Sequence, residues 1–161
     1  MDYRVSFDQS TGVYVELASG VSLTKLTATT LTAGKTYNFK VEARNSFGYS
    51  EASQAVAILC ATGPSTPAAP SNYVDGPNVN IKWTKPKING LEITAYTVTI
   101  QTSTGSYLTE LAYCDGAKPD VVAATQCEIP LTTLITAPFN LARGDSVNVK
   151  VLATNAYGSS S

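Results

Sequence analysis

The chain has 161 residues, more than the roughly 100 that one β-sandwich needs and fewer than two complete ones require. Only 14% of the residues are charged, the formal net charge is -1, and histidine is absent. These values argue against a nucleic-acid surface, and the lack of histidine removes the most common general base and metal ligand. The sequence is rich in threonine, a β-branched residue that favours strands, so an all-β fold is the first expectation.

In chain order, the first predicted strand covers residues 3–7, where tyrosine, valine and phenylalanine alternate with polar residues. A second alternating run at residues 37–43 predicts a core strand with one buried face. The apolar run at residues 55–60 has the length of a buried strand and is too short for a membrane span, so no membrane span is expected.

A proline-rich stretch then separates two parts of the chain. Because proline lacks the amide hydrogen that a strand needs, residues 63–70 predict an extended linker. Beyond it, residues 79–83 alternate as a strand, Asn89-Gly90 predicts a turn, and residues 93–100 alternate again. The predicted organisation has three parts: a first unit at residues 1–62, the linker at residues 63–70, and a second unit at residues 71–161.

The two units share an internal repeat. Residues 31–48 recur 110 positions later, at residues 141–158, with apolar residues at the same alternate positions. Upstream, residues 3–12 recur 93 positions later. The difference between the two offsets means that the second unit carries an insert of about 17 residues, placed at about residues 106–127.

The order of these motifs resembles that of a fibronectin type III domain. The resemblance rests on the run at residues 79–86, the Asn89-Gly90 turn, Tyr96-Thr97-Val98, and the Leu-x-x-Gly-x-x-Tyr pattern that leads into residues 39–48. It implies an all-β fold of two immunoglobulin-like sandwich units in tandem. By this resemblance the first unit contains strands C to G and lacks strands A and B, while the second contains strands A to F and lacks strand G.

The resemblance also implies a particular hydrogen bond. Leu31, Gly34 and Tyr37 match the tyrosine-corner pattern, in which the phenol hydroxyl bonds to backbone a few residues upstream. The second copy has Val147 at the position of Tyr37, which puts the corner hydrogen bond of that unit in question.

The insert resembles, more narrowly, Cys-bearing modules of very large extracellular and cell-surface proteins of ciliates and other protists. The resemblance rests on Tyr113-Cys114-Asp115-Gly116 and on residues 125–131. It implies a disulfide between Cys114 and Cys127, which would stabilise the loop and indicate an oxidising compartment. The alternative is two reduced thiols in an intracellular protein. Cys60 is then either a small buried hydrophobic residue or a thiol for an intermolecular disulfide.

Arg143-Gly144-Asp145 is the tripeptide that binds integrins in one fibronectin repeat. There it lies at the tip of the loop between strands F and G. Here the repeat aligns it with Ala33-Gly34-Lys35, in the turn before strand F. The alignment favours a structural turn in which glycine supplies a positive φ, and adhesion is the second interpretation.

Two further groups of residues contain polar side chains that bear on possible sites. Ser65 and Thr66 lie beside proline in the predicted linker and are candidates for O-glycosylation, with a bare spacer as the alternative. Asp115, Asp120 and Glu128 show neither the spacing of a calcium loop nor that of a catalytic pair, so we interpret them as solvated loop acids. No catalytic, metal or cofactor site is expected.

Together, these patterns predict a structural segment of a fibrous array outside the cell or at its surface, without enzymatic activity or cofactors. The missing strands would leave unpaired edges and apolar faces, which neighbouring repeats or strands from adjacent copies would complete in a linear assembly. Glycans are a second expected partner. The alternatives are an accessory polysaccharide- or protein-binding module of a larger secreted enzyme or adhesin, and an intracellular sandwich array.

Overall fold

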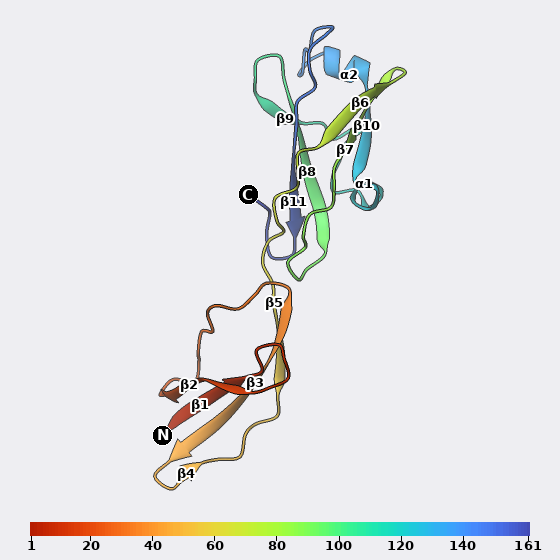
Figure 1. The fold of residues 1–161 in the computed structure, drawn as a ribbon. Coiled ribbons are helices and arrows are strands. Elements are labelled where there is room, and N and C mark those ends of the chain that lie inside the picture. Colours follow the sequence, from red (N-terminus) through yellow and green to blue (C-terminus); the bar gives the residue numbers. More distant parts are fainter. The chain divides into compact units, whose positions relative to one another are not determined.

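The computed structural model describes the whole chain, residues 1–161, and divides into two compact units, Met1–Thr62 and Gly63–Ser161, called unit 1 and unit 2 below. Nearly all regular structure is antiparallel β-strand, which confirms the all-β prediction (Figure 1). The two helices have six and five residues, whereas a helix that crosses a bilayer needs about 20.

Unit 1 is a single antiparallel sheet. Its strands are β1 (Asp2–Phe7), β2 (Val15–Val21), β3 (Lys35–Asn45), β4 (Gly48–Tyr49) and β5 (Val56–Cys60). Across the sheet the order is β2-β1-β3-β4, and β5 pairs with the first part of β3. Val5 of β1 lies opposite Val41 of β3. Phe7 likewise lies opposite Phe39, so the alternate apolar residues of both strands share one face of the sheet.

Unit 2 is a sandwich of two three-stranded antiparallel sheets. One sheet has the order β10-β7-β6, with β6 (Ser71–Asp75), β7 (Asn78–Lys82) and β10 (Gln126–Pro130). The other has the order β11-β8-β9, with β8 (Ile93–Gln101), β9 (Tyr107–Thr109) and β11 (Val149–Asn155). Helices α1 (Pro119–Ala124) and α2 (Leu131–Ile135) precede and follow β10 in the sequence.

The hydrophobic core is concentrated in unit 2, where apolar side chains from both sheets meet. Trp83 and Tyr96 lie in this core as an edge-to-face pair with ring centroids 5.2 Å apart. In unit 1, Tyr37 is the only buried hydrophobic side chain, and it is 6% exposed. The single sheet of unit 1 therefore lacks the second layer that would bury its apolar face.

The proline-rich stretch at residues 63–70 contains no helix or strand and packs against unit 2. Pro64 and Pro67 are buried, and the backbone N–H of Ser65 donates to the carbonyl of Lys87 at 3.0 Å. The sequence predicts an extended linker here. Its proline rings are apolar surface that can be buried against unit 2 without leaving an amide unpaired.

Candidate functional site

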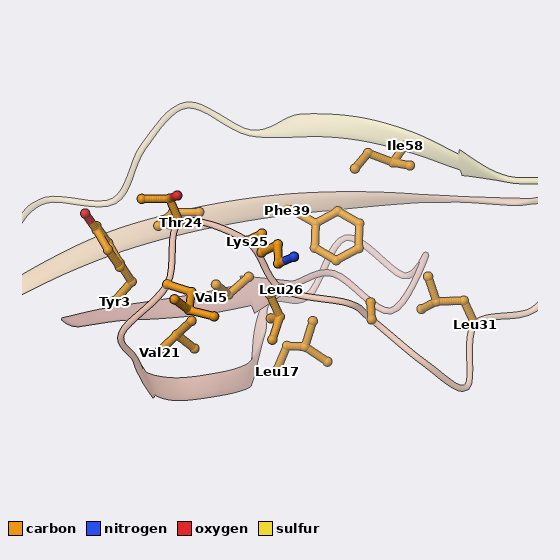
Figure 2. Close-up of a pocket in the computed structure, with 13 residues that line it drawn as sticks. Tyr3, Val5, Leu17, Val21, Thr24, Lys25, Leu26, Leu31, Phe39 and Ile58 are labelled. Carbon is orange, nitrogen blue, oxygen red and sulfur yellow. The ribbon is translucent and has the colours of Figure 1, made fainter.

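The most prominent feature of unit 1 is an apolar cavity of ≈ 450 Å³ on one face of its sheet (Figure 2). Strands β1, β2, β3 and β5 form one wall, and residues 22–31, which have no regular structure, form the other. Figure 2 shows Phe39 and Leu26, from these opposite walls, in the same cavity. We call this side of the sheet, which bears Val5, Phe39 and Val41, the cavity face.

The internal repeat provides a matched reference for the cavity face within the same chain. Val41 of β3 is 40% exposed, whereas its counterpart in β11, Val151, is 6% exposed. Val98, the counterpart of Val5, is also buried. The face that unit 2 buries beneath β6, β7 and β10 is therefore only partly covered in unit 1, where Val5 and Phe39 are half-buried.

Residues 22–31 close the cavity only in part. Leu23 lines the cavity and is still 62% exposed, and Leu26 and Ile58 are also exposed. The one charged residue in the lining is Lys25, and most of the other lining side chains are apolar. A contiguous exposed apolar surface of this kind can bind apolar side chains of a partner.

The opposite face of the unit 1 sheet is polar and ion-paired. The Arg4 guanidinium donates hydrogen bonds of 2.6 and 2.8 Å to the Glu42 carboxylate, and it lies 4.1 Å from the centre of the Tyr49 ring. The hydrogen bond from Arg4 lowers the pKa of Glu42 below its ordinary value. Asp2 and Arg44 form a second ion pair. The cavity face is therefore the apolar face of this sheet, and it is only partly covered.

Asp8, just after β1, is a buried carboxylate with all its hydrogen bonds made inside unit 1. Oδ2 accepts a bond of 2.6 Å from the side-chain amide of Asn38, and Oδ1 accepts from the backbone N–H groups of Asn38 and Ser10, both at 2.9 Å. These bonds, chiefly the one from the Asn38 side chain, lower the pKa of Asp8. The carboxylate ties the turn after β1 to β3.

The structure places Arg143-Gly144-Asp145 in a tight turn. The φ of Gly144 is +98°, and that of its counterpart Gly34 is +83°, so both positions require glycine. The N–H of Asp145 donates to the carbonyl of Ala142 at 3.1 Å. In return, the carboxylate of Asp145 accepts the N–H of Ala142 at 2.8 Å. The Asp145 side chain is thus engaged in holding the turn.

The same amide position is satisfied differently in unit 1. There the N–H of Thr32 donates to the phenol oxygen of Tyr37 at 2.9 Å, which is the corner hydrogen bond that the resemblance implied. In unit 2, where Val147 replaces the tyrosine, Asp145 supplies the acceptor. This role was not predicted from the sequence, although an aspartate directly after the aligned turn glycine is a signal for it.

A disulfide joins Cys114 and Cys127, which are both buried and whose Cα atoms lie 5.2 Å apart. The carboxylate of Glu110 accepts hydrogen bonds of 2.8–3.1 Å from the N–H groups of residues 112–114. The insert is therefore a folded part of unit 2. The role of Glu110 was not predicted, because nothing in its sequence neighbourhood marks it as a buried acceptor.

The other predicted site residues lie apart from one another. Cys60 ends β5 and is partly exposed, and its carbonyl accepts the N–H of Gly34 at 2.7 Å. The hydroxyl of Thr66 donates to the carbonyl of Ser161 at 2.8 Å. Thr66 is exposed and Ser65 is half-buried, so Thr66 is the more accessible of the two candidates for O-glycosylation.

The acidic residues of the insert do not converge on a common site. Asp115 accepts the N–H of Ala117 at 3.0 Å, Asp120 lies in the first turn of α1, and Glu128 accepts a hydrogen bond from the side chain of Asn78. No group of three or more His, Cys, Asp or Glu residues in the chain is arranged to hold a metal ion.

Unit 2, with two antiparallel sheets around one core, has β-sandwich architecture, an architecture that fibronectin type III and immunoglobulin-like domains share. Three similar solved structures are multidomain segments. A two-domain fibronectin type III segment from chicken tenascin has 19% identity, covers 100% of this chain and 80% of its own, and has a TM-score of 0.44. The FN1–FN3 domains of chicken CNTN1 have 13% identity, 99% and 52% coverage and a TM-score of 0.40. Three domains from titin have 19% identity, 99% and 51% coverage and a TM-score of 0.49.

Sequence comparison adds a short match to a curated protein. A Kelch domain-containing protein of Saccharolobus solfataricus is 38% identical over 69 residues, which is 43% of this chain and 10% of that protein. The chain therefore spans about a tenth of that relative's length. No family model matches the chain. The expected resemblance to surface proteins of protists is not supported by these comparisons.

Proposed function

We propose that the chain is a structural, non-catalytic segment of a longer fibrous array outside the cell or at its surface, in which a neighbouring β-hairpin covers the cavity face of unit 1. The observation that carries the proposal is the contrast between Val41, 40% exposed, and its counterpart Val151, 6% exposed. The same repeat thus builds one buried face and one open face. An open apolar face favours association with a partner that removes it from water.

Unit 2 indicates the chemistry of such a partner. Strands β6 and β7 form an antiparallel hairpin, and Val79 and Ile81 of β7 are completely buried in the core. A hairpin with this alternation would fill the cavity with aliphatic side chains and keep its polar residues on the outer side. Neighbouring repeats of the array, or further copies of this chain, are the proposed source.

The disulfide supports the location in this proposal. Cystines of this kind persist in oxidising compartments and are rare where thiols are kept reduced. The Cys114–Cys127 disulfide therefore favours an extracellular or cell-surface array over an intracellular one. Intact-mass measurement of the native protein tests this point, because a protein with both thiols reduced is heavier by two hydrogen atoms than the oxidised protein.

A fusion tests the proposed role of the cavity face. A second copy of residues 64–93 is placed directly before Met1, where the repeat offset of 93 brings it into the spacing that it has in unit 2. We expect the amides near Val5 and Val41 to gain protection from hydrogen exchange. Binding of an apolar fluorescent dye to the chain should fall at the same time, since the exposed face is covered.

The matched control carries Val79→Asp and Ile81→Asp in the added copy only. These changes keep the length and turn of the hairpin but remove its apolar side chains, so dye binding should stay at the level of the parent chain. If the unmodified fusion binds as much dye as the parent chain, the cavity face does not take a hairpin of this type and the proposal fails.

A second candidate, an accessory polysaccharide-binding module, is favoured by one separate observation. Phe47 and Tyr157 occupy the same position of the repeat and are 98% and 68% exposed. The backbone N–H of each is held at 2.9 Å by an asparagine side chain two residues earlier, so both rings are presented from ordered turns. If the chain binds insoluble polysaccharide and a Phe47→Ala, Tyr157→Ala double variant does not, this function is supported. Equal retention of both proteins excludes it.

A further inference from the structure

Unit 2 has a pocket of its own, of ≈ 290 Å³, and its lining side chains are mostly polar. The lining residues come from two segments: residues 101–105, where β8 ends, and residues 141–148, which lead into β11. Sites for small molecules have volumes of about 300–1,000 Å³. The pocket is therefore at the small end of this range and suits a ligand with one small ring in it.

Backbone hydrogen bonds within unit 2 hold the walls of this pocket. The N–H of Thr102 donates to the carbonyl of Ser106 at 2.7 Å. The N–H of Ser103 donates to the carbonyl of Phe139 at 2.9 Å. Thr102 and Leu141 are the buried members of the lining, whereas most of the others are exposed. Because the walls are already fixed, a ligand would have little of the protein to order when it binds.

Several polar groups in the lining have hydrogen-bonding capacity that the protein does not use. One carboxylate oxygen of Asp145 accepts a backbone N–H of its own turn at 2.8 Å, and the other oxygen accepts none. The side-chain amide of Asn148 donates to Gln101 at 2.9 Å, while its oxygen accepts no hydrogen bond. The hydroxyls of Ser103 and Ser146 make no hydrogen bond inside the chain.

Charge and hydrogen-bonding type favour one class of ligand for these groups. Asp145 is the only charged residue of the lining, so an anion would be repelled. An ammonium or guanidinium group only donates, so it would leave the serine hydroxyl hydrogens without acceptors. A hydroxyl both donates and accepts, so a ligand with several hydroxyls can match the carboxylate, the amide and the serines together.

The internal repeat shows that this lining is specific to unit 2. The repeat aligns Gln101 with Asp8 of unit 1. The Asp8 side chain is buried, and its carboxylate takes its hydrogen bonds from Asn38 and Ser10. At the position of Asp145, unit 1 has a lysine. The equivalent place in unit 1 therefore differs in both charge and free acceptors, and it serves as a reference within the same chain.

We propose that this polar pocket binds one sugar unit of a neutral saccharide. Asp145 and Asn148 accept hydrogen bonds from the sugar hydroxyls, and Ser103 and Ser146 both donate to and accept from them. The proposal goes beyond the array function above. It also uses neither of the two exposed aromatic residues considered for polysaccharide binding, so it can fail or stand independently of both earlier functions.

An aromatic ring lies beside the pocket on the same face of the sheet. Tyr107 of β9 is directly opposite Gln101 of β8, and residues paired in this way point to the same side. The Lys150 ammonium lies 4.1 Å from the centre of the Tyr107 ring. Sugars carry apolar C–H faces as well as hydroxyls, and an aromatic ring is a suitable surface for these faces. Disaccharides are therefore included among the probes below.

Titration of the full chain with soluble sugars, followed by amide resonances, tests the proposal. The probes are glucose, galactose, mannose, maltose, cellobiose and lactose, each added separately. Concentrations reach about 100 mM, because a single small pocket is expected to give a Kd in the millimolar range. We expect saturable shifts with at least one probe at residues 101–105 and 145–148. The counterparts in unit 1, residues 8–12 and 35–38, should not respond.

Two variants remove hydroxyls from the lining without removing a hydrogen bond from the fold. Ser103→Ala and Ser146→Ala should each raise the Kd of the best probe by about two- to tenfold. Ser106→Ala is the matched control, because Ser106 is exposed in the same hairpin but does not line the pocket. This control should bind the sugar as the parent chain does.

Three outcomes would overturn the proposal. The first is the absence of a saturable shift with any of these sugars. The second is equal affinity of the parent chain and both serine variants of the lining. The third is the same set of shifts with calcium chloride alone and their loss in Asp145→Asn, which keeps an oxygen for the turn N–H but removes the charge. That result would assign the pocket to a cation.

Discussion

Gly116, in the insert of unit 2, packs directly against the backbone of β8. Its carbonyl accepts the N–H of Tyr96 at 2.8 Å. A Cβ atom built on Gly116 would lie 2.0 Å from the carbonyl oxygen of Tyr96, which is closer than side-chain carbons approach any atom. Tyr96 is paired with Ala153 of β11, so the obstacle is fixed main chain and cannot rotate away.

Gly116→Ala is therefore expected to destabilise unit 2 by about 1–3.5 kcal/mol. The insert must move by more than 1 Å to restore a contact of at least 3.0 Å. Overpacking of this kind costs about 1–3 kcal/mol, and the lost hydrogen bond costs about 1 kcal/mol. The reduced freedom of alanine in the unfolded chain offsets about 0.4–1 kcal/mol of this loss.

Urea unfolding followed by tryptophan fluorescence measures the effect, because Trp83 is the single tryptophan and lies in the unit 2 core. Gly158→Ala is the matched control: a Cβ there meets no atom within 4 Å, and the φ of Gly158 is not in the left-handed region. The control should lie within about 0.5 kcal/mol of the parent chain. A Gly116→Ala variant as stable as this control would refute the argument from close packing.

Three further changes have expected outcomes in the same chain. Asp145→Ala should cost unit 2 about 0.5–1 kcal/mol, because the turn loses an acceptor, whereas Asp145→Asn keeps an acceptor oxygen and should cost little. Replacing both Cys114 and Cys127 by serine should cost about 3 kcal/mol, the value for a closed loop of about this length. The pKa of Asp8 is lowered, chiefly by the hydrogen bond from the Asn38 side chain. The ionised carboxylate therefore stabilises unit 1 at pH values above the ordinary aspartate pKa. That stability should fall as the pH drops below about 4, and Asp8→Asn should flatten this dependence.

Each of these three has a distinct measurement and a contradicting result. Trp83 fluorescence in urea serves for the unit 2 variants, and equal midpoints for Asp145→Ala and Asp145→Asn would remove the proposed role of the side-chain acceptor. Addition of a reducing agent to the parent chain should reproduce the effect of the double serine variant. For Asp8, hydrogen exchange of β1 and β3 amides at pH 3 and pH 6 gives the pH dependence, and an identical slope in Asp8→Asn would contradict its assignment to that residue.

Strands could be predicted well from the sequence where apolar residues alternate with polar ones and the same pattern recurs in both units. The run at residues 37–43 lies within β3, and the run at residues 93–100 corresponds almost entirely to β8. Both are long and alternate strictly, so one face must be apolar whatever lies opposite. The disulfide pairing entered through the resemblance of the insert and is present in the structure.

What the sequence did not reveal depends on contacts between distant segments. The proline-rich stretch reads as a spacer, because composition does not show that Pro64 and Pro67 are buried. The predicted strand at residues 147–153 begins in the structure only at Val149, since strand assignment depends on the partner as well as on alternation. Gly116 and Glu110 act through backbone groups that no local pattern identifies.

The two units use different side chains to accept the same turn N–H, and this difference has a consequence for how such repeats diverge. Unit 1 has Lys35 and Tyr37 at the two positions where unit 2 has Asp145 and Val147. In each unit one of the two side chains accepts the hydrogen bond from the turn N–H, and the other side chain is not needed for it. The two positions should therefore vary as a pair in further repeats of this type. An Arg-Gly-Asp string can then arise as a by-product of losing the tyrosine, with no selection for adhesion.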